Sequence, residues 1–306
     1  MERKVIVILG PTCSGKTAAA LSLANRLGSE VISADSRQVY RFLDIGTAKP
    51  TENELKLIKH HFIGTLNPVE AFNVSKFEED ALRIIRSLHK ENKIPVVAGG
   101  SGLYIKALVE GIFNTAETDE ELRQELKTRL DNYGREFLYE ELMKVDPRAA
   151  GTMLPQNWKR VMRALEVFYL TGRSILDHHQ EYERNLNIDF LKFGLNWDRE
   201  ILYRNIEARV DQMIESGLVD EVKSIMNMGY GKELNSLNTV GYKEIIMYLS
   251  AEISLERAVE LIKRNTRRYA KRQLTWFRSD TQINWFDIHS ASDLLNVPDK
   301  ILRFLQ

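Results

Sequence analysis

Short runs of apolar residues recur along the chain and predict the strands of a buried sheet. The first run is residues 5–9, similar runs lie at 29–34, 94–98 and 190–195, and 62–64 is a shorter candidate. These runs lack the alternation of apolar and polar residues that marks a half-exposed strand. Such strands are typical of a parallel sheet with helices on both faces, so the pattern predicts an α/β fold.

Other segments show the three- and four-residue apolar spacing of amphipathic helices. Residues 16–27 form the first expected helix, which ends at Gly28, a common position for a C-terminal glycine. From residue 114 to about 187 the pattern is helical throughout. We therefore expect a core domain of residues 1–113 and 199–306, interrupted by an all-helical insertion domain at 114–198. The other expected helices are 52–59, 75–91, 119–131, 134–145, 157–170, 198–216 and 254–278.

A glycine-rich segment follows the first predicted strand and has the spacing G-x-x-x-x-G-K-[ST]. Strand, glycine turn and helix in this order form the phosphate-binding loop of P-loop NTPase-like folds. The backbone N–H groups, the helix N-terminus and Lys16 attract a di- or triphosphate, and Thr17 is placed to hold Mg²⁺. The segment consists of Gly10, Pro11, Thr12, Cys13, Ser14, Gly15, Lys16 and Thr17.

The composition narrows the function classes only a little. The 306 residues include 43 Lys and Arg and 43 Asp and Glu, so the net charge neither favours nor excludes nucleic acid. The single cysteine, Cys13, excludes an internal disulfide and a cysteine-based zinc site. No run approaches the roughly 20 apolar residues of a membrane span, and residues 1–4 lead directly into the first strand without a signal sequence. We expect a cytoplasmic protein with no membrane contact.

Polar residues follow two of the predicted strands, at the sheet edge where α/β proteins bind ligands. Asp35 ends the second run, while Gly99, Gly100 and Ser101 follow the run 94–98. Two glycines at this edge allow a ligand to approach the backbone closely. Simpler interpretations stay open, because Asp35 can cap the next helix or support Mg²⁺ through water, and Ser101 can be an ordinary helix N-cap.

The helix expected at residues 254–278 carries a local excess of positive charge over Glu256 and Glu260. Basic and aromatic side chains together suit nucleic-acid phosphates and stacked bases. The alternative is a solvated helix whose cations pair with acidic neighbours. The positive residues are Arg257, Lys263, Arg264, Arg267, Arg268, Lys271, Arg272 and Arg278, with Tyr269, Trp276 and Phe277 among them.

Sequence signatures of several other P-loop classes are missing. The run 94–98 ends in glycines instead of the Asp-Glu pair of motor ATPases, and residues 92–95 lack the aspartate of a guanine-binding N-K-x-D. The six histidines show no metal-ligand spacing. Two classes remain: a nucleotide or metabolite kinase, for which Arg160 and Arg163 could form a lid over ATP, and a transferase with a diphosphate leaving group.

Seven sequence blocks, in order, resemble the tRNA dimethylallyltransferase (tRNA isopentenyltransferase) family of bacterial type. They extend from the first strand to the last helices, so the resemblance covers nearly the whole chain and is far more specific than the phosphate loop alone. It favours the transferase over the kinase. The blocks are residues 10–17, 35–40, 44–50, 99–104, 159–166, 240–244 and 271–278.

The resemblance implies transfer of a dimethylallyl group from dimethylallyl diphosphate to the N6 amine of the adenine 3′ of the anticodon, in tRNAs reading codons that begin with U. The phosphate loop would bind the donor's diphosphate, with Lys16 and Mg²⁺ stabilising the leaving group. Arg209 matches a family arginine that approaches the same diphosphate. Asp35 would orient or deprotonate the attacking amine, and Ser101, where many relatives have threonine, would help to position it. The adenine would have to be flipped out of the loop.

The resemblance also assigns residues that contact the tRNA anticodon stem-loop. Recognition of such loops normally uses base stacking and base-edge contacts. The insertion domain would clamp the anticodon arm, and we expect a monomer. The assigned residues are Asp35, Ser36, Arg37, Gln38, Ser101, Arg123, Lys159, Arg160, Val161, Met162, Arg163, Asn238, Thr239, Val240, Gly241, Tyr242, Lys243, Lys271, Arg272, Gln273, Leu274, Thr275, Trp276, Phe277 and Arg278.

Overall fold

The structure, a computed structural model, describes residues 3–112, 119–181 and 186–305. The chain forms two compact units, which are treated separately. The first unit contains Met1–Val109 and Asn187–Gln306, and the second contains Glu110–Leu186. None of the helices in these described ranges combines the length and the apolar character needed to cross a membrane.

The first unit is built on a six-stranded sheet in which every neighbouring pair is parallel, with the order β3-β2-β4-β1-β5-β6. β2 and β4 are buried along their whole length, and β1 is buried except at its first residue, as their uninterrupted apolar runs predict. The predicted α/β fold with a parallel sheet is confirmed. The strands are β1 (Lys4–Leu9), β2 (Val31–Ala34), β3 (His60–His61), β4 (Val96–Gly99), β5 (Asp189–Trp197) and β6 (Asn284–Ile288).

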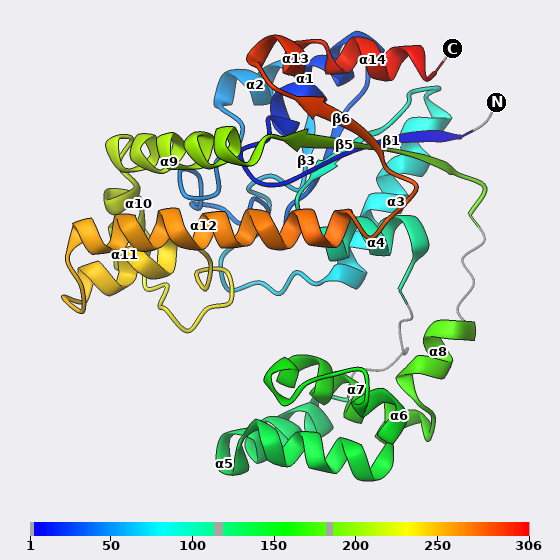
Figure 1. The fold of residues 1–306 in the computed structure, drawn as a ribbon, viewed down its shortest axis with the longest axis vertical. Helices are drawn as coiled ribbons and strands as arrows, with labels where there is room; N and C mark the ends of the chain where they lie inside the picture. Colours follow the sequence, from blue (N-terminus) through cyan, green and yellow to red (C-terminus); the bar gives the residue numbers. More distant parts are fainter. Residues whose placement is uncertain (1–2, 113–118, 182–185, 306) are drawn as a thin grey trace. The chain divides into compact units, whose positions relative to one another are not determined.

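Helices cover both faces of this sheet (Figure 1). On one side lie α1 (Lys16–Leu27), α13 (Ala291–Leu295) and α14 (Val297–Arg303). On the other side lie α3 (Val74–Lys90), α4 (Gly102–Glu110) and the long α12 (Leu255–Phe277). The remaining helices of this unit are α2 (Glu52–Leu57), α9 (Arg199–Glu215), α10 (Leu218–Asn227) and α11 (Tyr242–Leu249).

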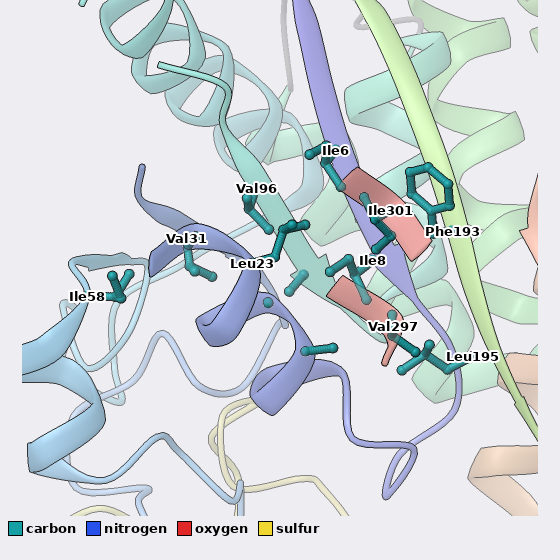
Figure 2. Close-up of a cluster of buried hydrophobic side chains, with 14 of the residues drawn as sticks. Ile6, Ile8, Leu23, Val31, Ile58, Val96, Phe193, Leu195, Val297 and Ile301 are labelled. Atoms are coloured by element: carbon teal, nitrogen blue, oxygen red, sulfur yellow. The ribbon is translucent and has the colours of Figure 1, made fainter. Parts of the chain in front are cut away.

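The core between the sheet and α1 fixes the start of the phosphate-binding segment (Figure 2). Ala19, Ala20 and Ala24 are buried on α1, and their small side chains let the helix lie close to the strands. Fully burying each of the larger members contributes about 1.5–3 kcal/mol. Because β1 and α1 are both anchored, the turn that joins them has little freedom. The larger members include Ile6, Ile8, Leu23, Val96, Phe193, Leu195, Val297 and Ile301.

Two sequence expectations for the first unit are wrong. The short strand expected at residues 62–64 lies two residues earlier, as β3 (His60–His61), because Phe62 has a left-handed backbone (φ 63°) that ends the strand. The insertion domain does not extend to residue 198, because β5 pairs with β1 and β6 inside the sheet. The other expected boundary, at residues 113–114, lies outside the described residues. β6, α13 and α14 were not expected.

In the described part of the second unit, all regular secondary structure is helical. Its elements are α5 (Glu120–Val145), α6 (Pro147–Ala150), the short 3-10 helix η1 (Pro155–Asn157), α7 (Trp158–Thr171) and α8 (Ile175–Glu181). Gly134 has φ 83° and interrupts α5, so its two halves correspond to the helices predicted at 119–131 and 134–145. Leu126, Leu138 and Leu165 are fully buried in a core of this unit's own.

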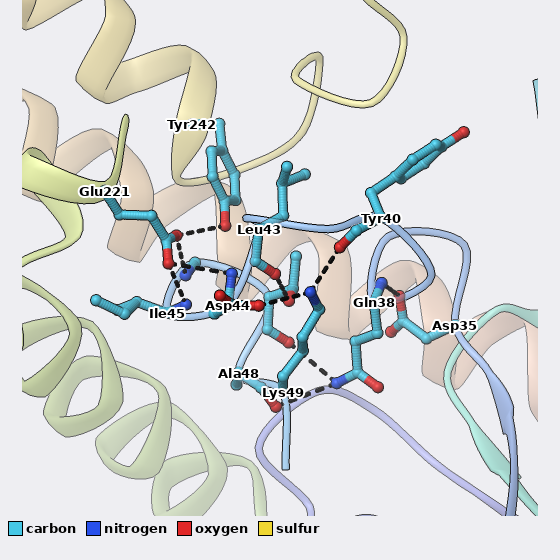
Figure 3. A network of polar contacts seen from close by, with 12 residues as sticks. Asp35, Gln38, Tyr40, Leu43, Asp44, Ile45, Ala48, Lys49, Glu221 and Tyr242 are labelled. Carbon is cyan, nitrogen blue, oxygen red and sulfur yellow. Dashed lines mark hydrogen bonds and ion pairs between the residues drawn. The ribbon is translucent and has the colours of Figure 1, made fainter. Parts of the chain in front are cut away.

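The loop at residues 44–50 is held by a carboxylate that the sequence did not single out (Figure 3). Glu221 of α10 accepts hydrogen bonds from the backbone N–H groups of Asp44, Ile45 and Gly46, at 3.0, 2.7 and 3.2 Å. The buried Tyr242 hydroxyl donates to the same carboxylate at 2.6 Å. The carboxylate thus satisfies several donors at once and fixes the direction of the loop.

Two long side chains complete this network from the other side. Lys49 Nζ donates to the Tyr40 carbonyl at 2.5 Å and pairs with Asp44 at 2.6 Å. Gln38 Nε2 donates to the carbonyls of Thr47 and Ala48, both at 3.1 Å. Figure 3 shows Gln38 between this loop and Asp35. The loop therefore forms a fixed wall next to the end of β2.

Replacing Glu221 tests this network. We expect Glu221→Ala to lower the free energy of unfolding by about 1–3 kcal/mol, because it leaves three amides and a tyrosine hydroxyl without their acceptor. Urea unfolding measures the change. The control is Glu260→Ala, which removes an exposed ion pair with Arg257 and is expected to cost less than about 1 kcal/mol. Equal effects of the two substitutions would exclude a supporting role for Glu221.

Candidate functional site

Residues Gly10 to Gly15 form a tight loop between β1 and α1, and Lys16 and Thr17 are the first residues of α1. Gly15 precedes α1 with φ 85°, a backbone conformation that strains any other residue, and a Cβ placed there would also displace the Leu294 side chain, 2.3 Å away at Cδ2. The Trp197 indole N–H donates to the Ser14 carbonyl at 3.0 Å. The loop is therefore held in shape by α13 and β5 in addition to its own glycines.

The backbone of this loop presents unpaired donors. Among the described residues, none accepts a hydrogen bond from the N–H of Cys13, Ser14 or Gly15. The first N–H groups of α1 also lack partners inside the helix, as at every helix start. Successive amides at a helix N-terminus bind anions, and phosphates in particular.

Two cations converge on the same place. Lys16 and Arg209 of α9 both line the cavity beside the loop. Burial, and then the nearby Arg209 guanidinium, lower the pKa of the Lys16 ammonium to about 8. Lys16 Nζ donates to the Pro11 carbonyl at 2.6 Å, and no carboxylate of the described residues lies within 4.0 Å of Arg209. Neither cation forms an ion pair in the described residues, although the Asp35 carboxylate of the same cavity partly offsets their charge, and two cations so close together favour binding of an anionic ligand.

The cavity has a volume of about 830 Å³, within the usual range for ligand pockets. Its lining combines the phosphate loop with the ends of β2 and β4, the loop at residues 44–50, and side chains of α9 and α12. It thus lies at the carboxyl edge of a parallel sheet, where such folds bind ligands. Asp35, Arg209 and Tyr269 line it together, although they are far apart in the sequence.

Asp35 lines this cavity and is held by its own turn. Its Oδ1 accepts hydrogen bonds from the backbone N–H groups of Arg37 and Gln38, at 2.8 and 3.2 Å. Within the described part of the chain, no hydrogen bond reaches Oδ2. The expected cap of a helix is wrong, because a turn follows Asp35. Oδ1 stabilises that turn, while Oδ2 is available to a ligand.

Ser101 lies next to this turn but is not among the residues that line the cavity. Its Oγ accepts a hydrogen bond from the Ser36 N–H at 3.1 Å, and its backbone N–H donates to the Ala34 carbonyl at 3.2 Å. Its hydroxyl thus helps to fix the turn that carries Asp35. This contact connects β4 with the end of β2.

The glycines at and after the end of β4 make room for neighbouring protein groups as well as lining the cavity. A Cβ at Gly100 would lie 2.2 Å from Nε2 of Gln273, and a Cβ at Gly102 would lie 2.3 Å from the Trp276 ring. A Cβ at Gly99 would lie 2.1 Å from the Ala34 carbonyl oxygen. These positions are kept small by the close approach of β2 and α12, although Gly99 and Gly100 also line the cavity.

The charges of α12 divide into two groups. Arg257, Lys263 and Arg267 pair with Glu260, Asp211 and Glu207, at 2.8, 2.6 and 2.5 Å, as the alternative interpretation predicts. The other four basic residues before the last turn are exposed, and no carboxylate of the described residues lies within 4.0 Å of them. Their spacing places them on one face of the helix. This open basic stripe consists of Arg264, Arg268, Lys271 and Arg272.

Several residues assigned to RNA contact have side chains that are not available for it in this structure. Tyr242, Gln273 and Phe277 are buried in the first unit, and Val161 and Met162 are buried in the second. The exposed members of the set include Asn238, Lys243, Lys271, Arg272, Thr275, Trp276 and Arg278 in the first unit, and Lys159 and Arg160 in the second. The half-buried ones are Ser36, Arg37, Gln38, Thr239, Val240, Leu274 and Arg163, and Gly241 is buried at the start of α11.

The arginines of the second unit are fixed by one buried carboxylate. Arg123 Nε donates to Glu166 at 2.7 Å, and Arg163 Nη1 donates to the same side chain at 3.1 Å. Glu166 is 4% exposed. The pairing holds both guanidinium groups on the surface of α5 and α7.

Two residues that support the site, Glu221 and Trp197, were not identified from the sequence. They belong to no motif, and their hydrogen-bond partners are distant in the sequence.

Comparison with known proteins bears on what this site does. A family model described as "IPP transferase" matches residues 38–280. The chain is 45% identical to the tRNA dimethylallyltransferase of Alkaliphilus oremlandii over 304 residues, 99% of this chain and 97% of that protein. It is 42% identical to the tRNA dimethylallyltransferase of Caldanaerobacter subterraneus, over 100% of this chain and 98% of that one.

Solved structures give the same result. The structure resembles the full-length tRNA isopentenylpyrophosphate transferase of Bacillus halodurans, with 40% identity, a TM-score of 0.73, and coverage of 99% of this chain and 97% of that one. It also resembles a eukaryotic dimethylallyltransferase acting on tRNA, with 28% identity, a TM-score of 0.82, and coverage of 98% and 77%. The P-loop NTPase-like class of the core is thereby confirmed, and the kinase alternative is not supported. The chain belongs to the IPP transferase family of tRNA dimethylallyltransferases.

Proposed function

We propose that this protein transfers a dimethylallyl group from dimethylallyl diphosphate to the N6 amine of the adenine 3′ of the anticodon, in tRNAs that read codons beginning with U. The observation that carries the proposal is the convergence of unpaired loop amides, Lys16 and Arg209 on a cavity that also contains Asp35. This arrangement suits a diphosphate leaving group beside a group that accepts a proton. The names of the relatives supply the tRNA and the prenyl donor.

The residues have complementary tasks in this reaction. The amine attacks the first carbon of the allyl group, the bond from that carbon to the diphosphate oxygen breaks, and the amine loses a proton. The loop amides, Lys16 and Arg209 hold the negative charge that develops on the leaving diphosphate. Asp35 Oδ2 orients the amine and accepts its proton, while Oδ1 keeps the turn in place. Ser101 positions Asp35 through the Ser36 N–H.

The donor set fits Mg²⁺ as the metal of this reaction. The described residues contain no group of three or more His, Cys, Asp or Glu side chains that could hold a metal ion by themselves. Mg²⁺ needs no such cage, because it binds one or two protein oxygens together with substrate phosphates and water. Thr17, which lines the cavity at the start of α1, would hold it. When bound, Mg²⁺ neutralises charge on the diphosphate.

The open basic stripe of α12 and the exposed Trp276 support RNA binding by the first unit. Phosphates would bind Arg264, Arg268, Lys271 and Arg272, and an unstacked base suits Trp276, which is 38% exposed. The helical unit, with the exposed Lys159 and Arg160, would bind the anticodon arm as an insertion domain. We also propose that the protein acts as a monomer in the cytoplasm.

The direct experiment combines labelled dimethylallyl diphosphate, Mg²⁺ and unmodified bulk tRNA, followed by nucleoside analysis. We expect label in the adenosine next to the anticodon. Label in another nucleoside would contradict the assigned position. ATP turnover with a small acceptor, and no label in the tRNA, would instead support a kinase.

The Asp35→Asn substitution tests the proposed base. The amide oxygen can still accept from Arg37 and Gln38, but the negative charge is lost. We expect kcat to fall by about 10²–10⁴-fold, the usual contribution of a general base, while the Kd for tRNA changes by less than about threefold. Single-turnover kinetics and filter binding measure the two effects. Equal losses in turnover and tRNA affinity would mean that Asp35 serves RNA binding.

The lowered pKa of Lys16 predicts a pH dependence. The ammonium is charged below pH 8 and loses its proton as the pH rises through that value, so kcat/KM for the donor should fall above about pH 8. Because Arg209 contributes to the lowering, Arg209→Gln should shift this fall to higher pH, whatever its effect on the absolute rate. Lys16→Arg keeps its charge over this range and should remove the fall. A wild-type profile that stays flat to pH 9.5 would contradict the assignment.

The open basic stripe can be separated from the paired cations of the same helix. We expect Arg272→Ala to weaken tRNA binding at low salt and to reduce the slope of log K against log salt by about one, the effect of one lost phosphate contact. Arg257→Ala removes the same charge from an ion-paired position and should leave the slope unchanged. Titrations at several salt concentrations test this. Identical slopes for the two variants would exclude a phosphate contact by Arg272.

A further inference from the structure

The side chain of Gln273 bonds to the protein backbone instead of facing the RNA-binding surface. It lies on α12 between the exposed Arg272 and Trp276, but its side chain points inward and is 6% exposed. Its Oε1 accepts a hydrogen bond from the backbone N–H of Thr12 in the phosphate loop, at 2.8 Å. Its Nε2 donates to the carbonyl of Gly100 after β4, at 2.9 Å. One amide side chain thus joins α12, the phosphate loop and the turn after β4.

The contact depends closely on the position of α12. The missing side chains at Gly100 and Gly102 allow α12 to approach, since a Cβ at either position would collide with Gln273 or Trp276. Both hydrogen bonds of Gln273 are buried or part-buried, so a shift of the helix would leave the Thr12 N–H or the Gly100 carbonyl unpaired. Unpaired buried groups of this kind are costly, which keeps helix and loop moving together.

The two faces of α12 therefore point to different ligands. The open basic stripe faces outward, while Gln273 faces the loop whose next three amides, of Cys13, Ser14 and Gly15, have no partner among the described residues. The Thr12 N–H, by contrast, is oriented by the Gln273 side chain and not by a ligand. Its orientation sets the direction in which the chain enters the turn that these three amides form.

We propose that Gln273 is a positioning residue that couples RNA binding on α12 to diphosphate binding in the phosphate loop. The inference rests on the proposed function. RNA that binds the open basic stripe favours the helix position in which Gln273 bonds Thr12 and Gly100, and this is also the position in which the loop amides are aligned for a diphosphate. By linkage, the diphosphate must strengthen RNA binding by the same factor.

The test measures binding of inorganic diphosphate with Mg²⁺ by calorimetry, with and without a saturating anticodon stem-loop RNA. For the wild type we expect RNA to tighten diphosphate binding by about fivefold or more, the lower end of typical coupling between sites. Gln273→Met has a similar length but cannot make either hydrogen bond, and should bring this ratio close to one. Gln273→Glu keeps an acceptor for the Thr12 N–H but cannot donate to Gly100, and should give an intermediate ratio.

Two controls separate coupling from a general loss of structure. Glu260→Gln changes an exposed residue of the same helix that lies outside the assigned RNA contacts, and should keep the wild-type ratio. RNA binding by Gln273→Met in the absence of diphosphate should stay within about threefold of the wild type, because the side chain is buried and faces away from the open basic stripe. A wild-type ratio of one, or a Gln273→Met ratio equal to the wild-type value, would overturn the proposal. Failure of the labelled-donor experiment would overturn the proposed function instead, because these ratios do not depend on transfer.

Discussion

The close approach of α12 to the ends of the central strands is the constraint on which the site depends. At positions 100 and 102 a larger residue would displace the side chains of Gln273 and Trp276 from the β4 turn. This approach brings Tyr269 and Gln273 to the cavity, although they lie more than 200 residues after the phosphate loop in the sequence. The same helix turns its open basic stripe outward. A single packing contact therefore determines both the inner wall of the site and the orientation of its charged surface.

The second organising feature is positive charge that the protein does not neutralise. Burial, and then the nearby Arg209 guanidinium, lower the pKa of Lys16, which reflects the cost of holding these positive groups together. Hydrophobic burial in the surrounding core offsets this cost, since the buried side chains of β1 and α1 anchor both ends of the loop. A site prepared in this way need not reorganise when a diphosphate leaves, which is the arrangement that stabilises a transition state most efficiently.

The sequence predicted those features that depend on local pattern. The apolar runs located β1, β2, β4 and β5, and the glycine and lysine spacing located the phosphate loop, because each signal lies within a few neighbouring residues. β6 was missed because Asn284 and Asp287 interrupt its apolar residues at the sheet edge. The glycines at 99 and 100 were interpreted as room for a ligand, since the sequence does not reveal that Ala34 and Gln273 fill that space. Long-range partners were the information that the sequence lacked.

The same limit applies to the blocks that identify the family. Residues 271–278 form one continuous block, but their side chains alternate between solvent and the interior. Lys271, Arg272 and Thr275 are exposed, while Gln273 and Phe277 are buried. In the second unit, Lys159 and Arg160 are exposed, whereas Val161 and Met162 belong to the core. A sequence block therefore identifies a segment that belongs to the site. Burial then distinguishes the exposed residues that contact a ligand from the buried residues that position them.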